Sequence, residues 1–146
     1  MVTLVEVWIL LSLIVLIAWG LWGFMLKYAE LQTSWFHVYV ASVAGLLTMH
    51  FIAITILALN GKMQGLELNR YTLIAYIGGL FGALGGLLFI LALRFGEASL
   101  IIPLTSLYPI IAVILSILIL GESITAKKIA GIIFVVVAII LISTPE

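Results

Sequence analysis

The sequence predicts an all-α, polytopic membrane protein with five transmembrane helices. Of its 146 residues, 66% are apolar and only 8% are charged, and the mean hydropathy is +1.44. This balance lies far outside the range of soluble domains. A helix needs about 20 mostly apolar residues to cross a bilayer. The chain contains five such runs, at residues 3–26, 35–59, 71–93, 98–120 and 125–143.

Charge and composition exclude several classes of function. The net charge is zero and the six basic residues are scattered among the ends of the runs, so no basic stripe could follow a nucleic acid. The sequence has no cysteine, and it lacks the HExxH, GxSxG and phosphate-loop motifs of membrane proteases, hydrolases and nucleotide-driven pumps. We therefore expect no cofactor, no metal, no enzymatic activity and no nucleic-acid partner.

The connections between the runs leave no room for a soluble domain, so residues 1–146 are expected to form a single transmembrane domain. Five crossings place the two termini on opposite sides of the membrane. Four cations fall on the amino-terminal side and two on the other, which favours a cytoplasmic amino terminus in the cell membrane. So small a difference also permits insertion in both orientations. The four are Lys62, Arg70, Lys127 and Lys128, and the two are Lys27 and Arg94.

The first run carries a face of aromatic residues. Trp8, Ser12, Trp19 and Trp22 lie within about 100° of one another on a helical wheel. Trp8 and Trp22 are near the ends, where an aromatic belt at the membrane interface is the ordinary explanation. Trp19 lies deeper, and it either packs against a neighbouring helix or lines a cavity for an apolar, aromatic or cationic solute.

The second and third runs each hold one unusual feature. His50 lies a few residues from the middle of its run, and an ionisable group at that depth is a functional candidate. The alternative is a neutral imidazole bonded to a neighbouring helix. In the third run, Gly78, Gly82 and Gly86 repeat every four residues, a pattern that lets helices pack closely in lipid. The alternative is that these glycines leave space for a ligand or for sliding.

The fourth run is interrupted by the segment PLTSLYP, residues 103–109. Proline removes a backbone hydrogen bond inside a helix, so Pro103 and Pro109 predict a kink. The polar residues here form two stripes, and neither suits lipid, so both must face protein or a water-filled cavity. Broken helices near the membrane centre often present backbone and hydroxyl groups to a transported solute. A kink without a ligand is the alternative. The stripes are Ser99, Pro103 and Ser106, and Thr105, Tyr108, Ala112 and Ser116.

The fifth run begins after a turn. In LGESITAKK, residues 120–128, Gly121 is expected to end one helix, and either Ser123 or Thr125 to cap the next.

Residues 92–143 resemble the EamA-type domain of the drug/metabolite transporter superfamily. The resemblance rests on the order and spacing of "EAS", "PL.SLYP" and "LGE.IT..K..G", and it extends more loosely to WGLWGFMLKYA at residues 19–29. It implies a secondary transporter whose usual form has two such domains in inverted orientation, ten helices in all. In the related small multidrug resistance proteins a membrane glutamate precedes a lysine on the first helix. Counted back from Lys27, that position holds Trp19 here.

A single five-helix domain is half of that ten-helix inverted-repeat fold, so an antiparallel homodimer would restore it. We therefore expect a secondary transporter of small metabolites or drugs, with a midplane cavity, the bilayer around it and a second copy as its partner. The residues expected to contact solute are Trp19, His50, Thr105, Ser106 and Tyr108. A non-transporting scaffold, or a regulatory subunit of a larger complex, is the alternative function.

Overall fold

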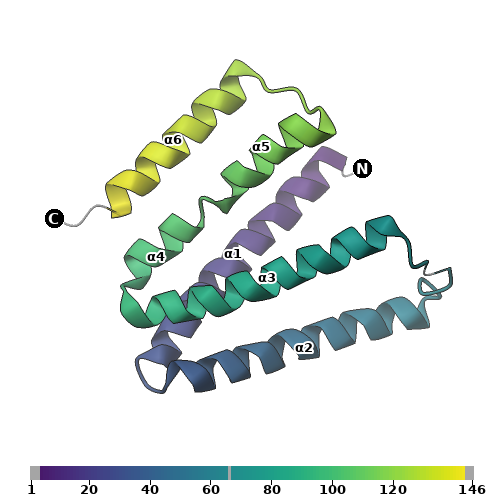
Figure 1. The fold of residues 1–146 in the computed structure, drawn as a ribbon, viewed down its shortest axis with the longest axis horizontal. Helices are drawn as coiled ribbons and strands as arrows, with labels where there is room; N and C mark the ends of the chain where they lie inside the picture. Colours follow the sequence, from purple (N-terminus) through teal and green to yellow (C-terminus); the bar gives the residue numbers. More distant parts are fainter. Residues whose placement is uncertain (1–3, 66, 144–146) are drawn as a thin grey trace. The chain divides into compact units, whose positions relative to one another are not determined.

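The computed structural model describes residues 4–65 and 67–143, and every regular element in this part is a helix. Four helices are long and apolar enough to cross a membrane, which confirms a polytopic all-helical protein: Val7–Glu30, Trp35–Leu59, Arg70–Phe95 and Ala98–Leu120. The fifth span stays a prediction. In order, the helices are α1 (Leu4–Glu30), α2 (Trp35–Leu59), α3 (Arg70–Phe95), α4 (Ala98–Thr105), α5 (Tyr108–Leu120) and α6 (Ala126–Ser143) (Figure 1).

The chain divides into two compact units, Met1–Arg94 and Phe95–Glu146. In the first unit, α2 begins and ends at the residues expected from the apolar run. The hydroxyl of Ser34 accepts a hydrogen bond from the His37 N–H at 3.5 Å and so caps the start of α2. At the other end, the Asn60 side chain donates to the carbonyl of Ile56 at 2.7 Å. The Ser34 hydroxyl therefore satisfies a backbone N–H that the helix itself leaves unpaired. The Asn60 side chain adds a second bond to the Ile56 carbonyl, which also accepts the backbone N–H of Asn60 at 3.1 Å.

Side-chain contacts tie the carboxyl-terminal end of α1 to that of α3. The Lys27 ammonium donates to the carbonyl of Leu93 at 2.6 Å and to a carboxylate oxygen of Glu30 at 3.1 Å. One turn earlier, the Trp22 ring stacks on Phe89 with centroids 5.1 Å apart. A cation at the carboxyl end of a helix satisfies free carbonyls and matches the helix dipole. We call these contacts the α1–α3 clamp.

In the second unit, α5 ends at Gly121, whose φ of +69° is a left-handed conformation that glycine adopts without strain. Its backbone N–H bonds to the carbonyl of Ser116, as expected for a helix stop. Of the two candidates for the following cap, the structure selects Thr125, whose hydroxyl accepts from the Lys128 N–H at 3.3 Å. Helices α4 and α6 pack against each other within this unit.

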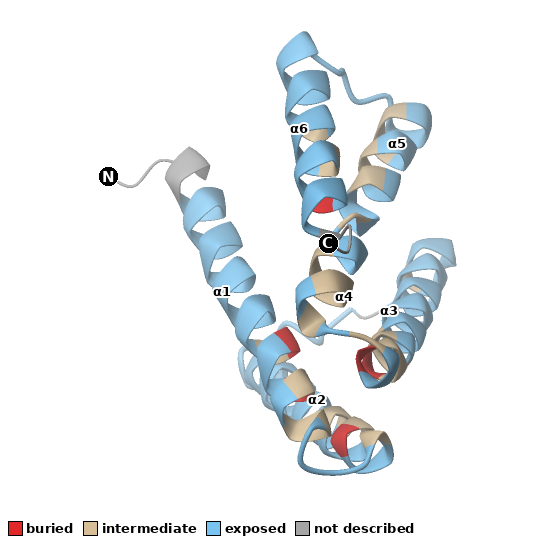
Figure 2. Ribbon diagram, turned by 90° about the vertical axis from the view of Figure 1, so that its left-hand side faces the viewer, coloured by how far each residue is buried: buried red, intermediate tan, exposed pale blue. Residues whose placement is uncertain are grey.

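Few side chains are buried, as Figure 2 shows for every helix. The buried residues are all apolar and no polar or charged residue joins them in the described chain. Most large apolar side chains of all six helices are exposed, a surface that water would not tolerate but that hydrocarbon covers without cost. The buried side chains are those of Leu26, Val38, Ile90, Leu93 and Ile139.

Candidate functional site

The fourth span is interrupted between α4 and α5. Helix α4 ends at Thr105 and α5 begins at Tyr108, with Ser106 and Leu107 between them. Pro109 has no N–H to donate to the carbonyl of Thr105, four residues earlier. The Ser106 N–H is shared between the carbonyls of Ile102 and Pro103, at 3.1 Å each. We call residues 105–108 the helix break, and its backbone has fewer regular hydrogen bonds than a continuous helix.

The hydroxyl groups of the helix break donate their protons locally. Thr105 Oγ1 donates to the carbonyls of Ile101 at 2.8 Å and Ile102 at 3.0 Å, and Ser106 Oγ donates to Ile102 at 2.7 Å. Each oxygen keeps lone pairs that can accept a hydrogen bond. Tyr108 is 54% exposed and follows directly. Three of the five predicted solute contacts therefore lie within one turn of chain, in a region suited to accepting hydrogen bonds from a ligand.

The other two predicted contacts, Trp19 and His50, lie on α1 and α2 of the first unit. The Trp19 side chain is 58% exposed. His50 Nδ1 lies 2.6 Å from the carbonyl oxygen of Leu46 in its own helix. Because a carbonyl only accepts, Nδ1 must carry a proton, and in the neutral ring Nε2 is then the free acceptor. The imidazole is thus bonded to its own helix and exposes one acceptor nitrogen.

A groove of about 370 Å³ lies between α1 and α2, and none of the five predicted contacts lines it. Its walls are apolar or small residues, with two methionines and one serine, and no lining residue is charged. Sequence reasoning assigned Trp22 to an aromatic belt and passed over Ser42. The lining residues are Trp22, Met25, Leu26 and Ala29 from α1, and Val38, Ala41, Ser42, Gly45, Leu46 and Met49 from α2. We call this the α1–α2 groove.

A signal for the α1–α2 groove was present in the sequence. Its α1 residues follow the spacing i, i+3, i+4, i+7, and its α2 residues continue the same pattern for three turns, so each set covers one helix face. Every helix of this apolar chain offers such faces, however, and spacing alone does not say which two meet.

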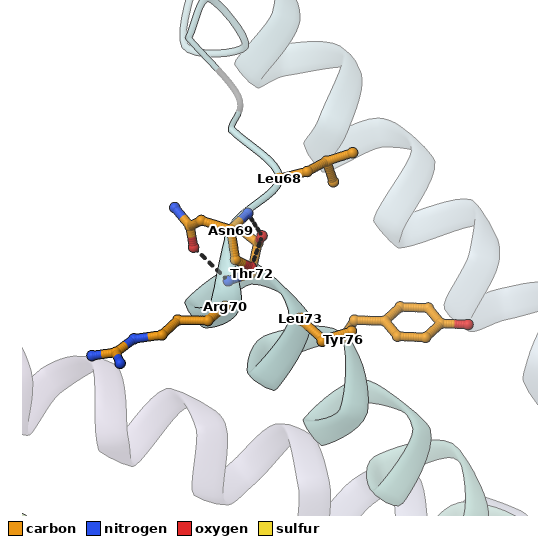
Figure 3. Close-up of a pocket in the computed structure, with 6 residues that line it drawn as sticks. All are labelled: Leu68, Asn69, Arg70, Thr72, Leu73 and Tyr76. Carbon is orange, nitrogen blue, oxygen red and sulfur yellow. Dashed lines mark hydrogen bonds between the residues drawn. The ribbon is translucent and has the colours of Figure 1, made fainter.

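A second hollow, of about 510 Å³, surrounds the start of α3 (Figure 3). Its polar groups already form a helix cap. The Asn69 carboxamide oxygen accepts from the backbone N–H groups of Tyr71 and Thr72 at 2.9 and 3.1 Å, and the Thr72 hydroxyl accepts from the Asn69 N–H at 2.9 Å. Arg70 and Tyr76 both line the hollow, but their side chains point away from each other and do not converge on one ligand position. This hollow is best explained by the helix start.

The glycine stripe of α3 is open within its own unit. A Cβ atom built at Gly78, Gly82 or Gly86 would meet no described atom of the first unit within 4 Å, apart from its own helix backbone and chain neighbours. The prediction that these glycines pack against another helix therefore stays a prediction. Within the part of the chain that the structure describes, no three His, Asp or Glu side chains gather closely enough to hold a metal ion.

Comparison with known proteins gives two similarities. The EamA-like transporter family matches residues 6–144 of the chain. The uncharacterized protein MJ1333.1 of Methanocaldococcus jannaschii is 32% identical over 137 residues, which cover 92% of this chain and 95% of that protein. No solved structure matches the chain.

Proposed function

The chain belongs to the EamA-like transporter family, and from this premise we propose that it is a secondary transporter of small metabolites or drugs. It is a multi-pass membrane protein with four helices that can cross the bilayer. The observation that carries the proposal is the helix break, because it interrupts a span that is otherwise continuous from Ala98 to Leu120. A transporter family is also in line with the expectation that the chain is not an enzyme.

The position of the helix break gives it a function in transport. Ser106 is the ninth of the 23 residues of its span, about 5 Å from the middle at 1.5 Å per residue. In hydrocarbon, each backbone group without a partner costs several kcal/mol. The helix break must therefore border protein or water, and a midplane cavity that holds solute supplies both. Since the sequence offers no machinery for hydrolysis, transport would be driven by a gradient of solute, protons or another ion.

Each proposed contact has a distinct chemical role. Thr105, Ser106 and the carbonyl that Pro109 leaves unpaired accept hydrogen bonds from the solute, and Tyr108 supplies a phenol group. His50 offers Nε2 as an acceptor, and the Trp19 ring offers a face for an apolar or cationic group. These five residues supply mainly acceptors, so a solute with hydrogen-bond donors or a positive charge would fit them.

The complete transporter is proposed to be an antiparallel homodimer in the cell membrane. Helix α6, 18 residues long with Lys127 and Lys128 in its first turn, would be the fifth span of each copy. Two copies in opposite orientations then make the ten-helix inverted repeat, and the nearly even distribution of cations supports insertion both ways. One copy would have its amino terminus in the cytoplasm, and the Gly78, Gly82 and Gly86 stripe would pack at a helix contact.

Orientation tagging tests the dimer. Reporters at both termini in intact cells should give a mixed signal at each terminus, and cross-linking should capture a self-paired product. A single orientation together with a stable different partner would instead favour the scaffold alternative, which the family match does not favour.

Transport itself is tested with purified protein in liposomes and a panel of radiolabelled amino acids, nucleosides and cationic drugs. Uptake or release of at least one solute above the rate in protein-free liposomes is expected. Failure across the whole panel, with protein shown to be folded and inserted, would contradict the proposal.

A further inference from the structure

The walls of the α1–α2 groove restrict the charge of any occupant. Its volume of about 370 Å³ falls within the range of small-molecule sites, roughly 300–1,000 Å³. No lining residue carries a charge, so an ionised ligand would lose its hydration without gaining a counter-charge. Met25 and Met49 have flexible, polarisable side chains that adapt to apolar shapes. An occupant of this groove must therefore be uncharged and mostly apolar.

Ser42 is the exception among the serines and threonines that the structure describes within α1–α3. A serine or threonine in a helix commonly bonds to a carbonyl of the preceding turn, and four others in α1–α3 bond to the backbone in this way. The Ser42 hydroxyl makes no hydrogen bond to any described residue, although the side chain is half-buried and lines the groove. The four that do bond are Ser12 to Trp8, Thr48 to Ala44, Thr55 to Phe51 and Thr72 to Asn69.

The depth of Ser42 makes the unpaired hydroxyl informative. Ser42 lies seven residues after Trp35, the first residue of α2, or about 10 Å along the helix axis. That position is inside the hydrocarbon region, where lipid tails have no hydrogen-bonding group to offer. In this conformation, the hydroxyl is available to a polar group of a molecule that fills the groove.

The α1 wall of the groove carries a second unpaired polar group. The indole N–H of Trp22 is buried and has no hydrogen-bond partner in the described chain. Buried polar groups are nearly always paired, and an unpaired one costs about 1–3 kcal/mol. The nitrogen lies beneath the surface, so pairing it requires a shift of the ring that stacks on Phe89. Trp22 lines the groove, but an occupant reaches its nitrogen only after such a shift, so Ser42 remains the polar group that the groove presents directly.

We propose that the α1–α2 groove is a binding site for an uncharged, largely apolar solute with one hydroxyl or carbonyl group that bonds to Ser42. This inference rests on the proposed transport function and, among the solutes proposed above, selects uncharged lipophilic molecules over cationic ones. A lipid acyl tail is the competing occupant, but it has no polar group along its length and would leave Ser42 unpaired.

Tryptophan fluorescence tests occupancy. One variant keeps Trp22 as its single tryptophan, with Trp8, Trp19 and Trp35 replaced by Phe. Bromine quenches indole fluorescence on contact. Bromoundecanol added to phosphatidylcholine vesicles that contain this variant should therefore quench the Trp22 emission to a saturating level. A matched variant that keeps only Trp8, which does not line the groove and is not among the proposed solute contacts, should show just the linear quenching of a bilayer probe. Gly45→Leu, which fills the groove, should abolish saturation. Gly20→Leu, also without a neighbour within 4 Å but outside the groove, should leave it intact.

The role of Ser42 is tested by comparing two probes. Bromoundecanol should bind Trp22-only protein about 3- to 10-fold more tightly than bromoundecane, the ratio expected for one hydrogen bond. Ser42→Ala should remove this preference without changing the affinity for bromoundecane. Quenching that does not saturate, or an equal preference in both proteins, would overturn the proposal. So would saturation by brominated phosphatidylcholine at the same mole fraction, because a lipid tail would then be the occupant.

Binding and transport fail in different ways. Saturable binding in the groove without uptake of any solute would support the binding site and contradict the proposed transport function. Uptake of solutes without saturable binding in the groove would support the proposed transport function and overturn the proposed binding site.

Discussion

Helix α2 and the α4–α5 span hold similar polar side chains but differ in their backbones. In α2, Thr48, His50 and Thr55 all bond to carbonyls four residues earlier, and the helix runs unbroken for 25 residues. In the α4–α5 span, Thr105 and Ser106 also bond to their own helix, yet the backbone ladder stops at the helix break. Side-chain hydroxyls that bond to their own helix therefore do not by themselves mark a solute site, and our proposal for the α4–α5 span rests on its freed backbone.

The largest expected effect follows from repairing the helix break. Pro103→Ala with Pro109→Ala supplies two N–H groups, which can pair with the carbonyls of Ser99 and Thr105. The span then becomes a continuous helix, as α2 is. We expect the transport rate to fall by about tenfold or more, which corresponds to an increase of at least about 1.4 kcal/mol in the barrier to transport. Uptake into liposomes measures this effect.

The control for that experiment is Leu118→Ala, which changes an exposed residue of α5 far from the helix break. It should transport at the original rate. Unchanged transport in the double proline variant, with helix content preserved, would mean that the helix break is only structural.

The next effect concerns stability in the first unit. Lys27→Met removes the α1–α3 clamp's ammonium and leaves both the Leu93 carbonyl and the Glu30 carboxylate without this partner. Hydrogen bonds to charged groups contribute about 1.5–3 kcal/mol, and the Lys27 side chain is only 20% exposed. We expect the free energy of unfolding to fall by about 2 kcal/mol in a detergent titration followed by circular dichroism. Lys62→Met, in an exposed turn, should change it by less than about 0.5 kcal/mol. Equal effects would show that the clamp does not stabilise the unit.

Loss of the aromatic stack should have a smaller effect. Phe89→Leu keeps an apolar side chain but removes the ring that stacks on Trp22. Such ring pairs contribute about 0.5–1.5 kcal/mol beyond their buried area, so we expect unfolding to become easier by about 1 kcal/mol. Phe81→Leu is the matched control, since that ring is 70% exposed on the same helix. A loss as large in Phe81→Leu would count against a specific stack.

The smallest effect is expected at a hydroxyl of the continuous helix. Thr48→Val keeps the shape of the side chain and removes an exposed bond to the Ala44 carbonyl, a bond that the helix does not need. Both transport and the free energy of unfolding should stay within about 0.5 kcal/mol of the original protein. A strong loss of transport would show that the Thr48 hydroxyl contacts the solute directly and would remove the contrast with the hydroxyl groups of the α4–α5 span.

The sequence predicted the helices well because apolar length and capping residues are local signals. Residues 35–59 and the outer limits of residues 98–120 agree with the structure, and Gly121 ends α5 as expected. Helix α1 continues to Glu30, beyond the expected end at residue 26, since Lys27 and Glu30 pair along the helix and Lys27 reaches α3.

The α1–α2 groove could not be predicted in the same way. Its position depends on which faces of two helices meet, and nearly every face of this chain is apolar. The unpaired state of Ser42 is likewise visible only in three dimensions, because the sequence shows a serine like any other. The roles of Trp19 and His50 remain predictions for the same reason: their partners would come from contacts that sequence spacing does not define.

The central claim, that the helix break borders a water-filled cavity, is tested most directly by cysteine accessibility. The natural sequence has no cysteine, so Ser106→Cys introduces a single thiol at the helix break and Leu118→Cys a single thiol on the continuous part of α5. In intact membranes, a water-soluble maleimide should label Ser106→Cys and leave Leu118→Cys unmodified. Labelling of neither position, or of both equally, would contradict the account.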